Sequence, residues 1–376
     1  MDVEEKLKLA LRLPTEEVVT IEELRDLFER VSEPRFYNGF EPSGLAHLGT
    51  GVISVLKAND LIEAGARVIF LLADLHARIN RKLGGNLEHI RKAARYFIHV
   101  RKSLGIKERA EFVLASEIYN EEYREEVLKT SMQASLRRFR RALTIAGRQE
   151  SDELPLGMYI YIAMQVTDIH RLDLHGVEMG MDQRKATMLA REIAEKLNRR
   201  KPVAIHHHLL MSLQGPQRMD AKMSKSKPET AIFVHDSPEE IRKKIRKAYC
   251  PAKDPNNPIM DILRHIILRE PRHFVIERPE RYGGSVEVWS YEELEKLYVE
   301  GKIHPLDLKK AVAEELIKLL EPSRRYFEEN REARELLEFM KRLTITRRFL
   351  ICTSRSLGLR FIIYPLQART SIIRDR

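Results

Sequence analysis

Two patterns of hydrophobic and polar residues alternate between about residue 35 and residue 210. Short continuous apolar runs predict buried strands, and apolar residues spaced three and four apart predict helices. The predicted elements in chain order are a strand at 35–40, a helix at 51–64, a strand at 67–73, a helix at 87–104, a strand at 111–115, helices at 121–146 and 181–197, and a strand at 202–211. This alternation is typical of an α/β fold with a doubly wound parallel sheet, which binds ligands at the carboxyl ends of its strands.

After Ala231 the pattern predicts helices alone. Ser237 followed by Pro238 and two glutamates has the residues of a helix start, and Pro305 begins another stretch with apolar residues at helical spacing. We therefore predict three parts, which are an α/β domain over 1–231, an all-helical C-terminal domain over 232–342 and a basic tail over 343–376. For the tail two interpretations stay open: a disordered segment that attracts RNA, or an artefact of the reading frame.

Composition narrows the class of protein. The chain has 376 residues, of which 43% are hydrophobic and 32% charged, enough for a large core in two domains. No apolar run approaches the roughly 20 residues of a membrane helix, and the first ten residues do not resemble a signal peptide, so we expect a cytoplasmic protein without membrane contact. The two cysteines, Cys250 and Cys352, lack metal-binding spacing, and His206 to His208 alternate across a predicted strand, so no metal site is predicted.

The formal net charge of +10 says little about nucleic acid, because the segment from Lys341 onward has nine basic residues and one acid and so carries +8 of it. A local cluster is better evidence. Five arginines fall within fourteen acid-free residues: Arg137, Arg138, Arg140 and Arg141, on the face of the predicted helix 121–146 opposite its apolar residues, and Arg148 just after that helix. A solvated helix face remains the alternative explanation.

Two short segments indicate phosphate chemistry. Pro42 to Gly49 is a glycine-containing turn between a strand and a helix, and such turns let a nucleotide approach the backbone while the helix N-terminus faces phosphate oxygens. Lys222 to Ser226 is a loop with two lysines, which can neutralise the charge on a departing pyrophosphate. Together the two segments predict an enzyme that forms an adenylate.

At this point the residues are similar to a known family, the class I tyrosyl-tRNA synthetases of the archaeal and eukaryotic type. The resemblance covers roughly residues 15 to 322 and rests on five motifs in the expected order: 37–44 with His47-Leu48-Gly49, 72–76, 161–170, 181–185 and 222–226. It implies a Rossmann-type catalytic domain with a helical insertion for the acceptor stem and the dimer contact at about 118–160, a helical anticodon-binding domain, and a homodimer.

The resemblance also implies a tyrosine site. A phenol hydroxyl both donates and accepts a hydrogen bond, and Asp168 and Tyr37 are the expected partners. Tyr161, Gln165 and Gln183 are in the positions that the family uses for the substrate ammonium. Tyr161, Gln165 and Asp168 also share one helix face by their spacing, which is independent support. The alternative is an ordinary core face with a satisfied polar residue.

The implied adenylate site contains ATP, with Mg²⁺ on its phosphates. Gly44, His47, Gly49 and Thr50 are expected at the nucleotide, and Lys222 and Lys225 at the pyrophosphate. Thr50 departs from the family, which has a second histidine there; threonine can donate a hydrogen bond but carries no charge. No side chain acts as nucleophile, because the substrate carboxylate attacks the α-phosphorus.

The implied partner is tRNA(Tyr). Arg184 is in the position that reads the first acceptor-stem base pair, and Tyr282 and Asp307 resemble residues that stack on and hydrogen-bond an anticodon base. Asp307 can also be explained as an early helix acid.

Three other functions stay open from the sequence alone: a tryptophanyl-tRNA synthetase, a nucleotidyltransferase of cofactor biosynthesis, and an inactive RNA-binding homologue. The indole of tryptophan only donates, so the pair Tyr37 and Asp168 suits a phenol better. A nucleotidyltransferase would have no use for the helical domain after residue 232. The intact lysine loop argues against an inactive homologue.

Overall fold

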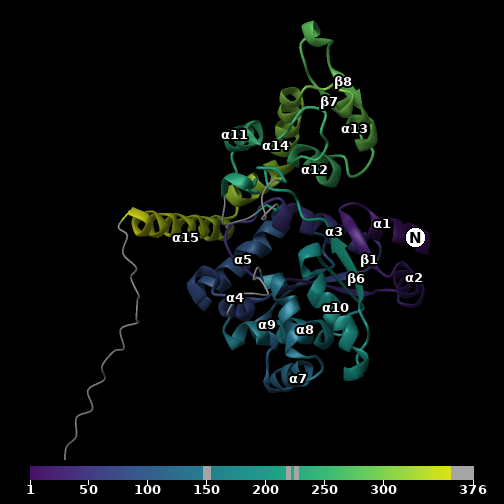
Figure 1. Ribbon diagram of the computed structural model, residues 1–376, viewed down its shortest axis with the longest axis vertical. Coiled ribbons are helices and arrows are strands. Elements are labelled where there is room, and N and C mark those ends of the chain that lie inside the picture. Colours follow the sequence, from purple (N-terminus) through teal and green to yellow (C-terminus); the bar gives the residue numbers. More distant parts are fainter. Residues whose placement is uncertain (147–153, 217–221, 224–227, 357–376) are drawn as a thin grey trace, which may run out of the picture.

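The computed structural model describes residues 1–146, 154–216, 222–223 and 228–356. A mixed α/β region forms its lower part in Figure 1 and a mostly helical region its upper part. The α/β region is built on a six-stranded sheet with the strand order β1-β6-β5-β2-β3-β4. All neighbouring strands are parallel except β1, which is antiparallel to β6. The α/β fold with a mostly parallel sheet is therefore confirmed.

The six strands are β1 (Thr15–Val19), β2 (Arg35–Phe40), β3 (Arg67–Leu72), β4 (Ala110–Leu114), β5 (Gly176–Gly180) and β6 (Val203–His207). The sequence predicts β2, β3, β4 and β6. It misses β5, whose five residues include Glu178 and two glycines, and β1, which carries two glutamates on an edge. Neither has the continuous apolar run that marks a buried parallel strand.

Helices cover both faces of the sheet because successive residues of each strand point to opposite sides. Phe36 of β2 packs with residues of α1 (Val3–Leu11), α2 (Ile21–Arg30) and α3 (Ser54–Glu63). Its neighbour Tyr37 packs with residues of α7 (Glu121–Ser131), α8 (Leu136–Ala142), α9 (Leu156–Arg171) and α10 (Arg184–Ile193). The remaining helices of this region are α4 (Asp74–Ile79), α5 (Leu87–Ser103) and α6 (Ala115–Ile118).

The strand order reverses beside β2. From β2 the chain runs outward through β3 and β4, whereas β5 and β6 lie on the other side of β2. Such a reversal leaves a crevice at the carboxyl ends of the two central strands, because the connections on either side lead to opposite faces. The crevice therefore lies above β2 and β5.

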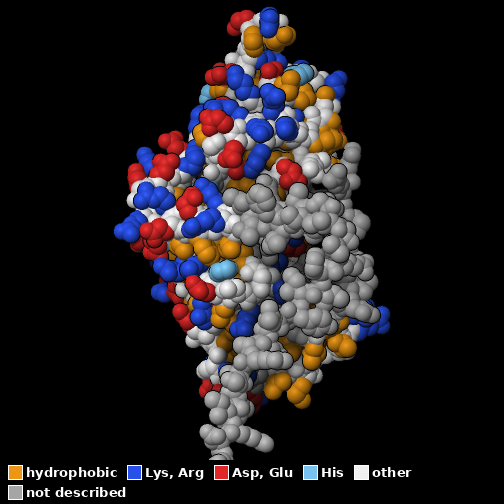
Figure 2. All heavy atoms as spheres, turned by 90° about the vertical axis from the view of Figure 1, so that its left-hand side faces the viewer, with side chains coloured by type: hydrophobic (Ala, Val, Ile, Leu, Met, Phe, Trp, Pro, Cys, Tyr) orange, Lys and Arg blue, Asp and Glu red, His pale blue; other side chains and the backbone are white. Residues whose placement is uncertain are grey.

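The helix predicted over 121–146 is wrong as a single element. It is broken into α7, α8 and a short 3₁₀ turn, Leu143–Ala146. The physical reason is Ser135, which has an extended backbone and caps α8 by accepting a hydrogen bond from the Arg138 N–H at 3.3 Å. Leu128, Met132 and Leu136, which suggested a buried stripe, are 65%, 80% and 65% exposed. Hydrophobic side chains are visible in the lower part of Figure 2, the end at which Figure 1 places α7.

The upper region contains α11 (Pro238–Lys247), α12 (Pro258–Ile262), α13 (Tyr291–Val299), α14 (Pro305–Glu329) and α15 (Arg331–Ser356). The expectation of helices alone is incomplete, because β7 (Phe274–Ile276) and β8 (Val286–Val288) form an antiparallel hairpin. Strands of three residues are too short to show alternation. The helix α15 also takes in residues 343–356 of the predicted tail, and residues 357–376 lie outside the described part of the chain.

A buried charge cluster joins the two regions. The ammonium of Lys57, on α3, donates to the carbonyls of Ala10 and Arg12 at 3.0 and 3.1 Å and to the Asp60 carboxylate at 3.1 Å. Asp60 also pairs with Arg12 at 3.2 Å and with Arg269 of the upper region at 2.5 Å. Lys57 is fully buried and Asp60 is 3% exposed, so the one carboxylate compensates several cations with little access to water.

We expect Asp60→Ala to lower the free energy of unfolding by about 3–5 kcal/mol, because it leaves the buried ammonium of Lys57 and the guanidinium of Arg269 without their carboxylate. Urea unfolding followed by circular dichroism measures the change. The matched control is Asp26→Ala, which removes an exposed carboxylate paired with Arg30 and should shift stability by less than about 0.5 kcal/mol. Equal effects of the two substitutions would show that the buried cluster does not stabilise the fold.

Candidate active site

A cavity of about 570 Å³ opens above the carboxyl ends of β2, β5 and β6. It is the crevice that the reversal of strand order creates. Its lining includes most of the side chains and glycines that the sequence singled out: Tyr37, Gly44, His47, Gly49, Thr50, Tyr161, Gln165, Gln183 and Lys222. Segments that are far apart in the sequence thus meet in one place.

The helix α9 supplies the polar wall of the cavity. Its residues from Tyr161 to His170 are all buried, so the polar side chains on it are fixed by packing. Gln165 donates to the Gln183 side-chain oxygen at 3.2 Å, and Gln183 donates to the Ile145 carbonyl at 3.1 Å. The side-chain oxygen of Gln165 is buried and has no hydrogen-bond partner among the described residues. It is a free acceptor at the cavity wall.

Asp168 lies one layer behind this wall. Its side chain is fully buried and is not part of the cavity lining. The Tyr119 hydroxyl donates to one carboxylate oxygen at 2.9 Å, and the Tyr123 hydroxyl donates to the other at 2.8 Å. Burial raises the pKa of Asp168 to about 7, and the two hydroxyls oppose the rise because they stabilise the ionised form.

Tyr37 and His76 line the cavity and lie close to Asp168. Burial, together with the charge of Asp168, raises the pKa of the Tyr37 hydroxyl well above its usual value. The His76 ring is 3.7 Å from the Asp168 carboxylate and contacts the Tyr161 ring edge-on, with centroids 4.6 Å apart. Burial lowers the pKa of His76 to about 4, so the ring is neutral at pH 7.

The Tyr37 side chain requires a glycine two residues along the same strand. It lies across Gly39, where an added Cβ would come within 1.9 Å of the Tyr37 hydroxyl oxygen. Glycine therefore permits a close approach that no other residue allows.

Sequence reasoning did not assign roles to His76, Tyr119, Tyr123 or Gly39. His76 and Gly39 lie within matched motifs but carried no predicted chemistry. The two tyrosines are four residues apart and stack with ring centroids 3.8 Å apart. Tyr119 precedes α7 and Tyr123 lies on it, so the helical i, i+4 rule gives no signal for the pair.

Local hydrogen bonds shape the backbone of the nucleotide turn. Gly44 has a φ of 62°, in the left-handed region that favours glycine. The His47 Nδ1 accepts a hydrogen bond from the Gly49 N–H at 3.2 Å, and the Thr50 hydroxyl oxygen accepts one from the His47 N–H at 3.2 Å. Thr50 thus holds the backbone of the turn. A π-helical turn (Gly49–Ile53) and α3 follow directly.

Lys222 and Met223, the described residues of the lysine loop, line the same cavity. The Lys222 ammonium pairs with the Asp182 carboxylate at 2.6 Å, and the Met223 N–H donates to the Leu210 carbonyl at 2.9 Å, which ties the loop to the segment after β6. Lys225 lies outside the described residues.

The floor between the central strands holds a buried carboxylate, Glu178 of β5. It accepts from the Asn38 amide of β2 at 2.7 Å and pairs closely with His207 of β6. Burial acts to raise the pKa of Glu178, but these partners outweigh it and hold the pKa below the usual value. Three strands are therefore linked where the cavity begins.

The predicted tRNA-binding residues lie outside the cavity lining. Arg184 begins α10, directly after Gln183, and pairs with Glu17 at 2.7 Å. Tyr282 is 60% exposed beside the hairpin β7–β8, and Asp307 is in the first turn of α14. Among the described residues, no helix is long and apolar enough to cross a membrane.

Comparison with known proteins shows which family the chain belongs to. The family model for class I tRNA synthetases (W and Y) matches residues 30–321. The chain is 46% identical over 374 residues to tyrosine-tRNA ligase 1 of Pyrobaculum aerophilum and 47% identical over 378 residues to the tyrosine-tRNA ligase of Pyrococcus furiosus. Each match covers 92% of this chain and the whole of the relative.

The crystal structure of tyrosyl-tRNA synthetase from Pyrococcus horikoshii in complex with L-tyrosine superposes with a TM-score of 0.86, at 45% identity, over 91% of this chain and all of that one. The predicted family is thus confirmed. The chain belongs to the class I tRNA synthetases for tryptophan and tyrosine, and within them to the tyrosine-tRNA ligases.

Proposed function

We propose that this chain activates L-tyrosine with ATP, giving tyrosyl-adenylate and pyrophosphate, and then transfers the tyrosine to the 3′ end of tRNA(Tyr) in the cytoplasm. The observation that carries the proposal is a single cavity that joins the polar face of α9, with Asp168 behind it, to the nucleotide turn and Lys222. The relatives named as tyrosine-tRNA ligases, and the Pyrococcus horikoshii structure with L-tyrosine, support it.

The phenol hydroxyl is recognised by Tyr37 and Asp168 in this proposal. Each carboxylate oxygen has two lone pairs, so an oxygen already bonded to Tyr119 or Tyr123 can accept a second hydrogen bond. Phenylalanine offers no hydroxyl and leaves that buried capacity unused, which is how such a site rejects it without editing.

The substrate ammonium is held by Tyr161, Gln165 and Gln183. An ammonium has three donors and no acceptor, and the buried free oxygen of Gln165 is the acceptor it needs. This contact fixes the end of the amino acid that carries the reacting carboxylate.

ATP binds with its phosphates at the turn formed by Gly44, His47, Gly49 and Thr50. The substrate carboxylate attacks the α-phosphorus in line, and the bond from that phosphorus to the pyrophosphate breaks. Mg²⁺ enters with the nucleotide, on phosphate oxygens, and we assign it no protein ligand. Lys222 and Lys225 neutralise the charge on the pyrophosphate. For Lys222 this means exchanging its ion pair with Asp182 for one with phosphate.

The tRNA contacts follow the family positions, with Arg184 at the acceptor stem and Tyr282 and Asp307 at the anticodon. An exposed tyrosine such as Tyr282 is suited to stacking on an unpaired base. Lys and Arg side chains are interspersed with acids over the upper region in Figure 2, so binding there rests on individual contacts more than on bulk charge.

We also propose a homodimer. The exposed apolar side chains of α7, α8 and α9 lie in the insertion at about 118–160, and water contact of so many large apolar groups is costly unless a partner covers them. They are Leu128, Met132, Leu136, Leu156 and Ile160.

Amino-acid-dependent pyrophosphate exchange tests the proposed reaction, with tyrosine active and tryptophan and phenylalanine inactive. We expect Asp168→Asn to reduce the ratio of kcat/KM for tyrosine over phenylalanine by about 10- to 100-fold, which corresponds to the loss of a hydrogen bond to a charged group. The control is Glu122→Gln, an exposed carboxylate on α7. An unchanged ratio in Asp168→Asn would remove Asp168 from the recognition of the phenol.

The raised pKa of Asp168 predicts a pH dependence. The carboxylate is ionised above about pH 7, and as the pH falls it becomes protonated and accepts a hydrogen bond more weakly. We expect the KM for tyrosine to rise by up to about tenfold per pH unit below 7. The phenol of the substrate, with a pKa of about 10, does not titrate in this range. The dependence should be absent in Asp168→Asn, and its persistence there would assign it to another group.

We expect Lys225→Ala to lower the kcat of pyrophosphate exchange by about 10²- to 10³-fold, as removal of one charge-stabilising donor does in other enzymes, with little change in the KM for tyrosine. The control is Lys310→Ala, an exposed lysine on α14. A rise in the tyrosine KM without a fall in kcat would contradict a role at the departing pyrophosphate.

A further inference from the structure

The three histidines around the end of β6, His206 to His208, lie in three separate environments. His206 contacts Glu17 and the Thr187 hydroxyl, and His207 pairs with Glu178. His208 instead faces the upper region, where Asp261 of α12 and His265 of the following π-helical turn (Leu263–Ile267) lie.

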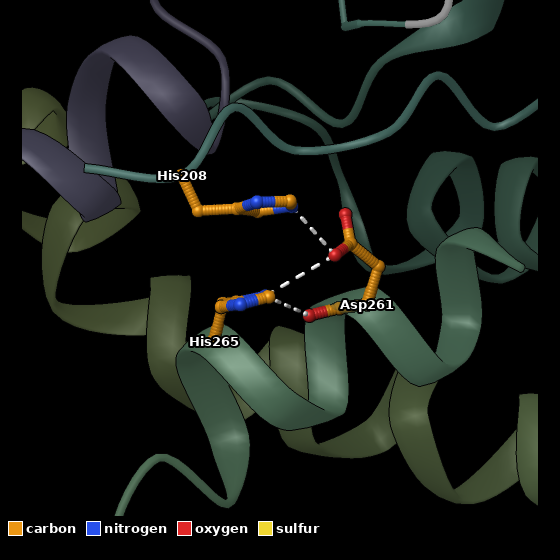
Figure 3. A group of neighbouring side chains, drawn as sticks. All are labelled: His208, Asp261 and His265. Carbon is orange, nitrogen blue, oxygen red and sulfur yellow. Dashed lines mark hydrogen bonds and ion pairs between the residues drawn. The ribbon is translucent and has the colours of Figure 1, made fainter. Parts of the chain in front are cut away.

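His208, Asp261 and His265 converge on one point (Figure 3). The His208 Nε2 is 2.8 Å from the Asp261 Oδ1, and the His265 Nδ1 is 3.1 Å from the same oxygen. One ligand atom from each residue lies within 4.8 Å of the other two. The donor set is two imidazole nitrogens and one carboxylate oxygen.

We propose that these three residues bind a divalent transition-metal ion, with Zn²⁺ the best match, at the junction of the α/β region and the upper region. Two histidines and one carboxylate form a common zinc-binding set that leaves further positions for water. The two nitrogen-to-oxygen distances are slightly shorter than the roughly 3.3 Å between neighbouring ligands of a tetrahedral zinc ion at about 2.0–2.1 Å.

The surroundings orient each ligand. Both ring nitrogens of His208 face carboxylate oxygens, which can only accept, so Nδ1–H donates to Glu16 at 3.3 Å and Nε2–H donates to Asp261 Oδ1 at 2.8 Å; a metal ion would take the place of the Nε2 proton. The second oxygen of Asp261 accepts the Met211 N–H at 2.7 Å, which leaves Oδ1 free to face the two rings. An outer shell of this kind is typical of metal sites and is not needed by a surface ion pair.

One adjustment accompanies binding. The rings of His208 and His265 are stacked, with centroids 3.9 Å apart and planes 15° apart, so their nitrogens point in nearly the same direction. The rings must tilt toward each other at the metal side for both lone pairs to meet the ion. The His208 side chain is partly buried and the His265 side chain is buried, so the tilt requires both side chains to rotate about their side-chain bonds.

The site would fix the base of the lysine loop. His208 lies in the cavity lining, and Met211, whose N–H bonds to Asp261, pairs across a β-bridge with Lys222. An ion held jointly by the segment after β6 and by α12 therefore connects the upper region to the loop through bonds that are stronger than the present hydrogen bonds.

The full-length chain, freed of metal with a chelator and dialysed, is titrated with Zn²⁺ by calorimetry and with Co²⁺ by visible absorption, which reports tetrahedral coordination. We expect one saturable Zn²⁺ site and a Co²⁺ spectrum with tetrahedral bands. Asp261→Asn, and His265→Phe, which keeps a ring for stacking, should each weaken Zn²⁺ binding at least tenfold, and Glu16→Gln should weaken it about tenfold. The matched control is His273→Phe, an exposed histidine of the same region, which should bind as the wild type does.

Circular dichroism of each variant establishes whether it is folded. If His265→Phe does not fold, Asp261→Asn still tests the site, because it hardly changes the side-chain volume. Absence of saturable binding by the wild type overturns the proposal. So does Zn²⁺ binding of unchanged strength in both Asp261→Asn and His265→Phe, which would place the ion elsewhere.

Discussion

The arrangement of the whole site depends on the carboxylate of Asp168, which has no access to water and needs hydrogen-bond donors from the protein. Asp168 is buried on α9, and removing a charge from water costs free energy that only partners within the protein can offset. Tyr119 and Tyr123 are those partners. They come from the segments just before and within α7, so the helical insertion is needed to build the pocket as well as to extend the domain. The raised pKa shows that the compensation is incomplete, and a substrate hydroxyl is the further donor that such a group accepts readily.

The sheet topology places this carboxylate near the nucleotide turn. The strand order reverses beside β2, and the turn that follows β2 and the ends of β5 and β6 meet above the sheet. Glu178 links β2, β5 and β6 at that level through Asn38 and His207. These strands are therefore joined at the cavity floor by side chains as well as by backbone hydrogen bonds.

The α/β class, the main parallel strands and the motifs of the site could be predicted from the sequence, because long apolar runs and fixed residue spacings are local signals. The sequence did not predict β5, because Glu178 interrupts its apolar run. The partners that make this buried glutamate stable lie in other strands, β2 and β6. The sequence also did not reveal Tyr119 and Tyr123 as partners of Asp168, because that pairing depends on how α7 and α9 pack. The helix predicted over 121–146 failed because exposed leucines before and after Ser135 continued the helical period of the buried Phe139 and Leu143 across the break at Ser135. The charge cluster at Asp60 and the three residues at His208 likewise join parts of the chain whose proximity no local pattern encodes.

The contact between Tyr37 and Gly39 has a consequence for redesign of the pocket. The aromatic ring occupies the space that any side chain at position 39 would need. A larger residue at 39 thus demands a smaller one at 37. Attempts to admit bulkier amino acids by changing Tyr37 alone would leave a hollow above a bare stretch of backbone, which a compensating side chain at 39 could fill.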